Sequence, residues 1–223
     1  MKKRIIFTVI LILLVLIIAV FAREFIIYNT GMLEKSAELS RDDVIQLLDK
    51  GANYKNYYFS PVQTPNATDD NIKTEYYIKD GIVVTYIDLK LIEWVNYNTG
   101  ECISFANSNE NTVGISNNAK KIENTQNGVD YSKIMDSSYD YKYLGKKVVD
   151  GRNVIYFELK NNDNIEQYQV DENSGLILKT MYATKKFGII TTYVVKSNEN
   201  IKFDVVSDEQ VKRPNLDNYK IVL

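Results

Sequence analysis

The stretch from residue 139 to residue 182 reads YDYKYLGKKVVDGRNVIYFELKNNDNIEQYQVDENSGLILKTMY, and it decides the fold. Asp150-Gly151 separates two runs of alternating side chains. An Asp-Gly pair in that setting predicts a tight hairpin, because glycine adopts positive φ without steric cost. Residues 171–175 (DENSG) separate the next two runs in the same way. Connections this short make neighbouring strands antiparallel, so the stretch predicts at least three consecutive antiparallel strands.

Similar turn-forming segments occur earlier in the chain. Asp80-Gly81 and the segment 98–100 (NTG) each lie between apolar runs, and further strand-like runs occupy residues 189–195 and 200–204. The predicted fold class is therefore mainly β, of the α+β type. We expect one curved antiparallel half-barrel sheet of about eight to eleven strands, because an open sheet of that width curls. The sheet is expected to wrap around one or two helices.

One helix is predicted to begin after Ser40. Ser40 is a good N-cap, and Asp42 and Asp43 are acidic residues in the first turn, where the helix dipole favours negative charge. Val44 and the pair 47–48 then share one apolar face. Gly51 is the predicted stop of this helix.

Four short motifs carry a family resemblance: residues 141–145 (YKYLG), 149–152 (VDGR), 168–171 (YQVD) and 174–176 (SGL). In this order the chain resembles the LolA-like, or outer-membrane lipoprotein-sorting, superfamily, over about residues 139–205 and more loosely after residue 40. The resemblance implies a curved sheet with helix across its concave face. It also implies binding of lipoprotein acyl chains or other lipids, or a role as an envelope-stress sensor domain.

The N-terminus predicts a membrane attachment. Residues 5–22 are apolar apart from Thr8 and follow Lys2, Lys3 and Arg4. A run near 20 residues long is sufficient to span a bilayer, and the preceding basic residues place the N-terminus in the cytoplasm. We expect a signal-anchor helix within residues 1–28, a linker over 29–39 and a LolA-like extracytoplasmic domain over 40–223. The alternative is secretion after cleavage near Ala22.

Composition excludes several kinds of chemistry. The chain has no histidine and one cysteine, Cys102, so it has no His-based catalytic triad, intrachain disulfide or His/Cys zinc site of its own. Acidic side chains outnumber basic ones after residue 4, which argues against a nucleic-acid partner. No glycine-rich phosphate loop is present. The sequence thus predicts a protein that is not an enzyme, with no cofactor and no metal.

The candidate binding residues come from an abundance of tyrosine, 17 in all. Amphipathic rings on a curved sheet are expected either to cover it or to line a hydrophobic cavity on its concave face. The predicted lining residues are Tyr76, Tyr86, Trp94, Tyr143, Tyr156, Tyr168 and Tyr193.

Two functions follow from these expectations. The first is a non-catalytic, membrane-tethered domain that binds a lipid, a lipidated protein or another hydrophobic partner, with the polar loop at residues 107–127 or a helix as a gate. The alternative is an envelope structural or regulatory module that binds a protein and has a filled core and no small ligand. The volume of the concave hollow discriminates between the two.

Overall fold

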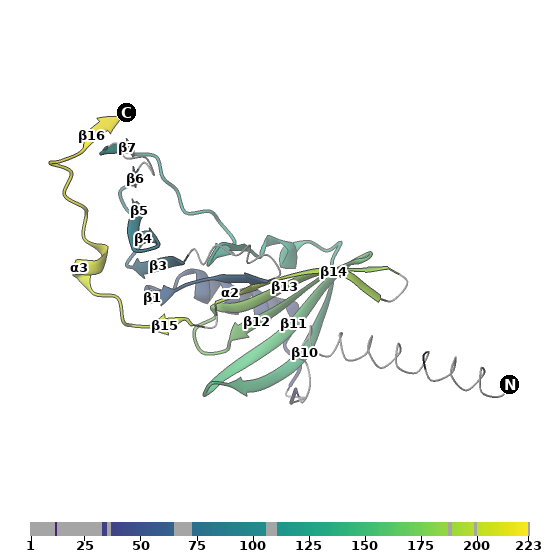
Figure 1. Cartoon of the computed structure of the whole chain (residues 1–223). Coiled ribbons are helices and arrows are strands. Elements are labelled where there is room, and N and C mark those ends of the chain that lie inside the picture. Colours follow the sequence, from purple (N-terminus) through teal and green to yellow (C-terminus); the bar gives the residue numbers. More distant parts are fainter. Residues whose placement is uncertain are drawn as a thin grey trace, which may run out of the picture.

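The computed structural model describes residues 12, 33–34, 37–64, 73–105, 111–186, 189–198 and 200–222 of the 223-residue chain. Within these residues the protein is mainly β, with two α-helices, one 3-10 helix, two large sheets and one small two-stranded sheet. The two large sheets form separate arms of the molecule, and neither closes into a barrel (Figure 1).

The six-stranded sheet contains most of the stretch 139–182. Its order is β10 (Asp140–Val149), β11 (Arg152–Asn161), β12 (Asn164–Asp171), β13 (Ile177–Lys186), β14 (Ile189–Ser197) and β2 (Val62–Thr64), and all neighbours are antiparallel. The predicted hairpin at Asp150-Gly151 is confirmed, with φ of 49° and 77° at the two residues. Both lie in the left-handed region that a type I′ turn requires.

The eight-stranded sheet combines six strands from residues 56–116 with two short strands that follow residue 201. Its order is β15 (Lys202–Phe203), β1 (Asn56–Phe59), β3 (Thr74–Lys79), β4 (Ile82–Ile87), β5 (Lys90–Asn96), β6 (Glu101–Phe105), β7 (Thr112–Ser116) and β16 (Lys220–Val222). Only the β7–β16 pair is parallel. The predicted Asp80-Gly81 hairpin joins β3 to β4.

The prediction of a single curved sheet is wrong, because the strands divide into two sheets at a corner. Only Ser60 and Pro61 separate β1 in one sheet from β2 in the other. Their partners β15 and β14 are likewise joined by the short segment 198–201. Proline has no N–H for a ladder hydrogen bond. The neighbouring Ser60 donates its backbone N–H to Asn200 Oδ1 and its Oγ hydroxyl to the carbonyl of Thr74. The eight-stranded sheet therefore loses this chain segment after Phe59, and the six-stranded sheet gains it at Val62.

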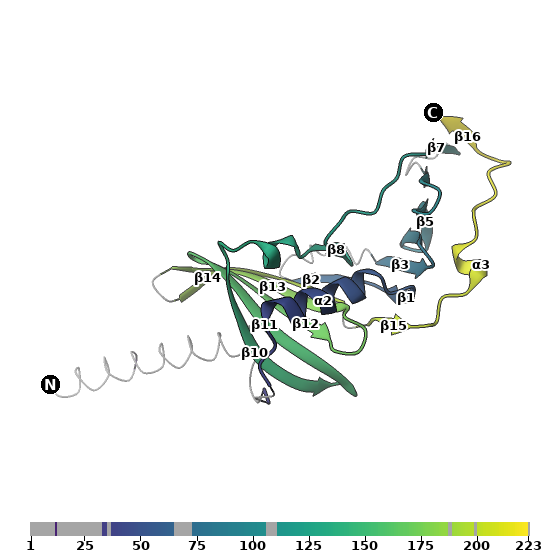
Figure 2. The same cartoon turned by 180° about the vertical axis from the view of Figure 1, so that it is seen from behind.

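The predicted helix is confirmed as α2 (Arg41–Ala52), and it lies along one face of the six-stranded sheet (Figure 2). Ser40 caps it by a reciprocal capping box with Asp43. Val44 and Leu48 are fully buried against Ile155 and Phe157 of β11. The same core includes residues of β9 (Val129–Asp130) and of the 3-10 helix η1 (Ser132–Met135). This face of the sheet is therefore filled with protein side chains.

Gly51 does not end the helix, contrary to the prediction. The helix continues to Ala52 and is capped by Asn53. Gly51 is buried against the turn that follows β12, where its missing side chain permits a backbone approach to Gly175.

No helix among the described residues is long and apolar enough to cross a membrane. The predicted span at residues 5–22 and the cleavage site near Ala22 lie outside the described residues, apart from Ile12.

Candidate ligand-binding cleft

The structure distributes the seven predicted binding residues over four separate packing clusters. Tyr143 and Tyr168 belong to the core between α2 and the six-stranded sheet. Tyr76 and Tyr156 lie in the cluster where the two sheets meet, and Tyr86 and Trp94 lie on the opposite face of the eight-stranded sheet. Tyr193 packs in a fourth cluster, with Ile190 and Val195. These side chains point to different faces of the two sheets, so they do not line one common cavity.

Several of these rings have structural partners of their own. Tyr168 is stacked on Phe157 with centroids 4.8 Å apart, and its hydroxyl donates to Glu166 at 2.8 Å. Tyr76 is stacked on Phe59 at 4.6 Å. Packing of this kind is expected of core aromatics.

A hollow of about 460 Å³ lies instead between the end of α2 and the inner face of the eight-stranded sheet. We call it the inner cleft. Tyr57, Ile78 and Val83 from β1, β3 and β4 line it, and Tyr54, Tyr97 and Lys121 approach from the surrounding loops. The two-residue period of the strands explains the lining: Val83 points away from its neighbours Ile82 and Val84, which pack on the opposite face.

The phenols of the inner cleft remain neutral at physiological pH. Burial raises the pKa of Tyr57 far above its ordinary value, and burial together with the charge of Glu93 raises the pKa of Tyr97. The cleft thus presents uncharged aromatic and aliphatic surface. Its charged groups are Lys55 and Lys121, with Asp80 at the β3–β4 turn.

Lys121, an exposed residue, lines both the inner cleft and a second hollow of about 280 Å³, which we call the outer hollow. Its ammonium donates a hydrogen bond to the carbonyl of Ala52, the last residue of α2. Ala52, Asn53 and Lys121 line both hollows. Partial desolvation lowers the pKa of Lys121, and none of the ion pairs among the described residues involves it.

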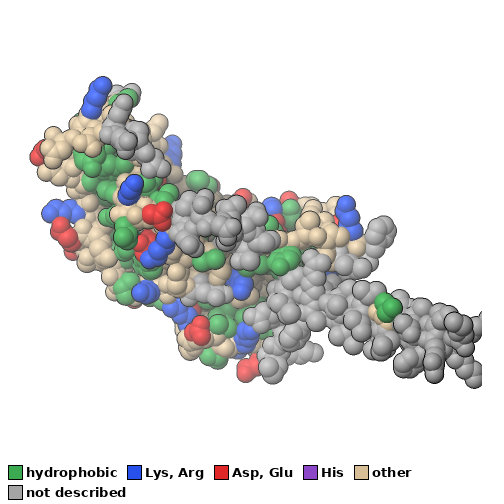
Figure 3. All heavy atoms as spheres, viewed as in Figure 1, with side chains coloured by type: hydrophobic (Ala, Val, Ile, Leu, Met, Phe, Trp, Pro, Cys, Tyr) green, Lys and Arg blue, Asp and Glu red, His purple; other side chains and the backbone are tan. Residues whose placement is uncertain are grey.

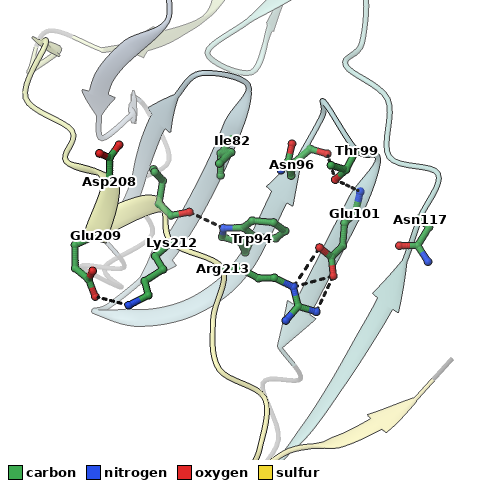
Figure 4. A pocket seen from close by; sticks show the side chains of 11 residues that line it. Ile82, Trp94, Asn96, Thr99, Glu101, Asn117, Asp208, Glu209, Lys212 and Arg213 are labelled. Atoms are coloured by element: carbon green, nitrogen blue, oxygen red, sulfur yellow. Dashed lines mark hydrogen bonds and ion pairs between the residues drawn. The ribbon is translucent and has the colours of Figure 1, made fainter.

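A further hollow, of about 590 Å³, lies on the other face of the eight-stranded sheet (Figure 4). Here the C-terminal segment with α3 (Asp208–Val211) crosses the sheet, and Trp94 Nε1 donates to the carbonyl of Val211 at 2.8 Å. The charged side chains are paired: Arg213 with Glu101 at 2.7 Å, Lys212 with Glu209 at 3.5 Å, and Asp208 with Lys79 at 2.5 Å. Trp94 is only 3% exposed, so this hollow offers neither a free aromatic face nor an unpaired charge.

The C-terminal part of the chain leaves apolar surface exposed. Tyr219, Ile221 and Val222 are 37–52% exposed. Figure 3 shows hydrophobic side chains gathered between charged ones over the arm that contains the eight-stranded sheet. This surface is open, whereas the inner cleft is recessed between secondary-structure elements.

Two observations concern metal and thiol chemistry. Across the described part of the chain, no three Asp, Glu or Cys side chains lie close enough together to hold a metal ion. Cys102 is half-buried with its thiol 3.6 Å from Glu93, and burial raises the pKa of that thiol. A raised thiol pKa reduces the thiolate that nucleophilic chemistry needs.

The sequence did not identify most residues of the inner cleft. Tyr57 and Val83 are not among the predicted lining residues, and Lys121 lies in the polar loop over residues 107–127 that is predicted as a gate. The contact between Lys121 and Ala52 joins positions 69 residues apart, and no local pattern predicts it. The one available signal was strand alternation, which places Val83 and Tyr86 on opposite faces.

No protein-family model and no curated protein sequence matches this chain. Solved structures do match it. The MucA/MucB complex of Pseudomonas aeruginosa is 14% identical, with a TM-score of 0.46 over 82% of this chain. The match covers 64% of that chain, so this protein spans less than two thirds of its length.

Two further solved structures show the same range of similarity. The lipoprotein LppX of Mycobacterium tuberculosis is 9% identical with a TM-score of 0.40, over 79% of this chain and 97% of that one. A LolA superfamily protein from Nitrosomonas europaea is 12% identical with a TM-score of 0.30, over 76% of this chain and 97% of that one. The LolA-like superfamily that the sequence motifs indicate is thus represented among the matched structures.

Proposed function

We propose that this protein is a membrane-tethered, extracytoplasmic binding protein that holds an apolar or lipidated ligand in the inner cleft and does no chemistry on it. The tether is the apolar run at residues 5–22, and the basic residues before it place the following domain outside the cell. The observation that carries the binding role is the inner cleft itself, a recess of about 460 Å³ with an aromatic and aliphatic floor.

The location of the cleft differs from the one that the sequence indicated. On the six-stranded sheet, α2 and η1 fill the face that was expected to be hollow: Leu48, Ile134 and Phe157 are each fully buried there. A ligand on that face would have to displace the helix. The inner cleft needs no such displacement, and its volume is within the range of about 300–1,000 Å³ typical of small-molecule sites.

Burial of apolar area supplies the binding energy in this proposal. Each square ångström removed from water contributes roughly 25 cal/mol, so a chain of a few methylene groups against Tyr57, Ile78 and Val83 gains several kcal/mol. A tethered protein stays at its membrane, so we infer that it captures, hands over or senses its ligand locally.

Native mass spectrometry of the full chain extracted from membranes in detergent tests the proposal. We expect wild-type protein to retain a hydrophobic ligand of defined mass. Val83→Phe places a ring in the cleft and should lower the retained fraction by about tenfold, equivalent to about 1.4 kcal/mol. Val148→Phe is the matched control, because Val148 is 66% exposed on β10.

The two variants make the result interpretable. Equal retention by wild type and Val83→Phe, with both proteins folded by circular dichroism, would place any ligand elsewhere. An absence of retained ligand across several detergents would reject the inner cleft as a site for an apolar ligand.

A second function, protein binding, is favoured by a specific observation at the edge of the eight-stranded sheet. Every residue of β16 is exposed, including Ile221 and Val222, and its pairing with β7 extends over three residues. An apolar edge strand of this kind is a template for pairing with another chain. Cross-linking from position 221 to a protein, with no lipid retained by the full chain, would favour this function.

A further inference from the structure

We propose that the ligand of the inner cleft is an anionic single-chain amphiphile, whose carboxylate or phosphate head group pairs with Lys121. This inference rests on the proposed function, because it names the class of ligand that the same cleft accepts. It is drawn from the position of Lys121, which lines both hollows.

Lys121 has a backbone partner. Among the described residues its ammonium donates to one carbonyl, that of Ala52 at the C-terminal end of α2. Helix C-termini carry partial negative charge and attract cations, but a carbonyl neutralises a cation less completely than a carboxylate does. Asp49 and Glu123 also line the outer hollow, yet neither forms an ion pair with Lys121 within the described part of the chain.

The charges that line the inner cleft are predominantly positive. Two cations, Lys55 and Lys121, line it against one carboxylate, that of Asp80. The remaining lining is aromatic, aliphatic or uncharged polar. A ligand that complements this arrangement has one anionic end and an apolar body.

The outer hollow, at about 280 Å³, is smaller than most ligand sites, and the inner cleft is of moderate size at about 460 Å³. Ala52, Asn53 and Lys121 line both hollows, so a head group paired with Lys121 lies where the two hollows adjoin. The chain of the ligand then occupies the inner cleft. Ile122, which is 72% exposed, lines the outer hollow and adds apolar surface there.

Photolabelling of the full chain in native membranes tests this inference. The probes are a diazirine derivative of a long-chain fatty acid and the matching diazirine fatty alcohol, which has the same chain without the charge. Labelled peptides are mapped, so that reaction within residues 1–28 is separated from reaction with residues 52–57 and 78–83, which border the inner cleft.

The variants compared are Lys121→Gln and Lys120→Gln. Lys120 is exposed, as Lys121 is, but it lines neither hollow, so it controls for the loss of a charge in the same loop. We expect Lys121→Gln to lower cleft labelling by the fatty acid by about tenfold and to change labelling by the alcohol by less than about twofold. Lys120→Gln should behave as wild type with both probes.

Each outcome separates the inference from the proposed function. If Lys121→Gln leaves fatty-acid labelling unchanged, or lowers labelling by acid and alcohol equally, the role of Lys121 is overturned while the cleft remains a ligand site. If neither probe labels the cleft peptides of the wild-type protein, both the role of Lys121 and the proposed function are rejected. Excess unlabelled fatty acid should compete with the probe. Competition by millimolar inorganic phosphate would show a general anion site instead.

Discussion

The backbones of Gly51 and Gly175 lie so close together that a Cβ atom on either residue would overlap the backbone of the opposing element: Gly175 in one case, Leu47 in the other. Gly51 is in the last turn of α2, and Gly175 occupies the left-handed region with φ of 77° in the turn before β13. This approach seats the end of α2 on the six-stranded sheet. It therefore also sets where Ala52 and the adjoining inner cleft lie.

The first prediction concerns this contact. Gly51→Ala should lower the free energy of unfolding by about 3 kcal/mol or more, because the overlapping atoms belong to backbone and cannot rotate away. Urea denaturation measures the change. Gly114→Ala is the matched control: no atom lies within 4 Å of its added Cβ, so its effect should stay within about 1 kcal/mol. A mild effect of Gly51→Ala would show that the helix end can shift, and with it the cleft.

Local sequence signals predicted the turns and the helix start well. Asp80-Gly81 and Asp150-Gly151 form the predicted hairpins, and Ser40 caps α2 as expected. These features depend on backbone conformations and hydrogen bonds within a few residues, so a short stretch determines them. Gly51 was assigned to the wrong role because its contact is with Gly175, far away in the sequence.

The division into two sheets and the position of the cleft could not be predicted in this way. Strand alternation across the Asp80-Gly81 hairpin places Tyr76 and Tyr86 on opposite faces, which argues against the prediction that both line one cavity. Alternation does not show what covers each face. Pro61 lies where the chain passes from the eight-stranded sheet to the six-stranded sheet, and a proline by itself does not predict such a change of sheet. The inner cleft depends on contacts among α2, the β3–β4 hairpin and residue 121, and such packing is determined only by the whole fold.

The second prediction concerns Gln126, a buried amide next to the Gly51–Gly175 contact. Its Nε2 donates to the carbonyls of Leu48 and Gly175, each at 3.1 Å, and its Oε1 accepts the amide of Ile177 at 2.8 Å. Gln126→Leu leaves these backbone groups without partners and should cost about 2–4 kcal/mol. Urea denaturation measures the loss, and amide exchange at Ile177 should accelerate.

Gln169→Leu provides the comparison for that variant, because Gln169 is a half-buried glutamine on β12 whose side chain makes no hydrogen bond that the described residues show. It should change the stability by less than about 1 kcal/mol. Similar losses for both variants would mean that general packing, and not the hydrogen bonds of Gln126, accounts for the effect.

The third prediction concerns pH. Glu75 is 6% exposed and accepts hydrogen bonds from Lys73 at 2.7 Å and Tyr58 at 2.6 Å, and these two bonds hold the pKa of its carboxyl below the usual value of 4.5. A carboxyl whose pKa is lower in the folded protein than in the unfolded chain stabilises the fold at pH values above its unfolded-state pKa. This contribution is lost as the pH falls through the folded pKa.

Thermal unfolding of wild type and Glu75→Gln as a function of pH checks this. The stability difference between the two proteins should be constant above about pH 5.5 and should shrink as the pH falls below 4.5. Glu209→Gln, at an exposed glutamate, should follow wild type throughout. A difference that persists unchanged at pH 2 would show that Glu75 acts through its shape and not through its charge.

The last prediction concerns how the C-terminal segment is held on the eight-stranded sheet. The bond from Trp94 Nε1 to the carbonyl of Val211 is buried, whereas the Arg213–Glu101 ion pair has side chains that are 50% and 22% exposed. Trp94→Phe leaves that carbonyl unsatisfied and should cost about 1–3 kcal/mol. Arg213→Gln should cost less than about 1 kcal/mol, because solvent screens the pair. Hydrogen exchange should then accelerate over residues 206–216 in Trp94→Phe and remain slow in α2. Equal acceleration in both regions would mean that the segment unfolds only together with the rest of the domain.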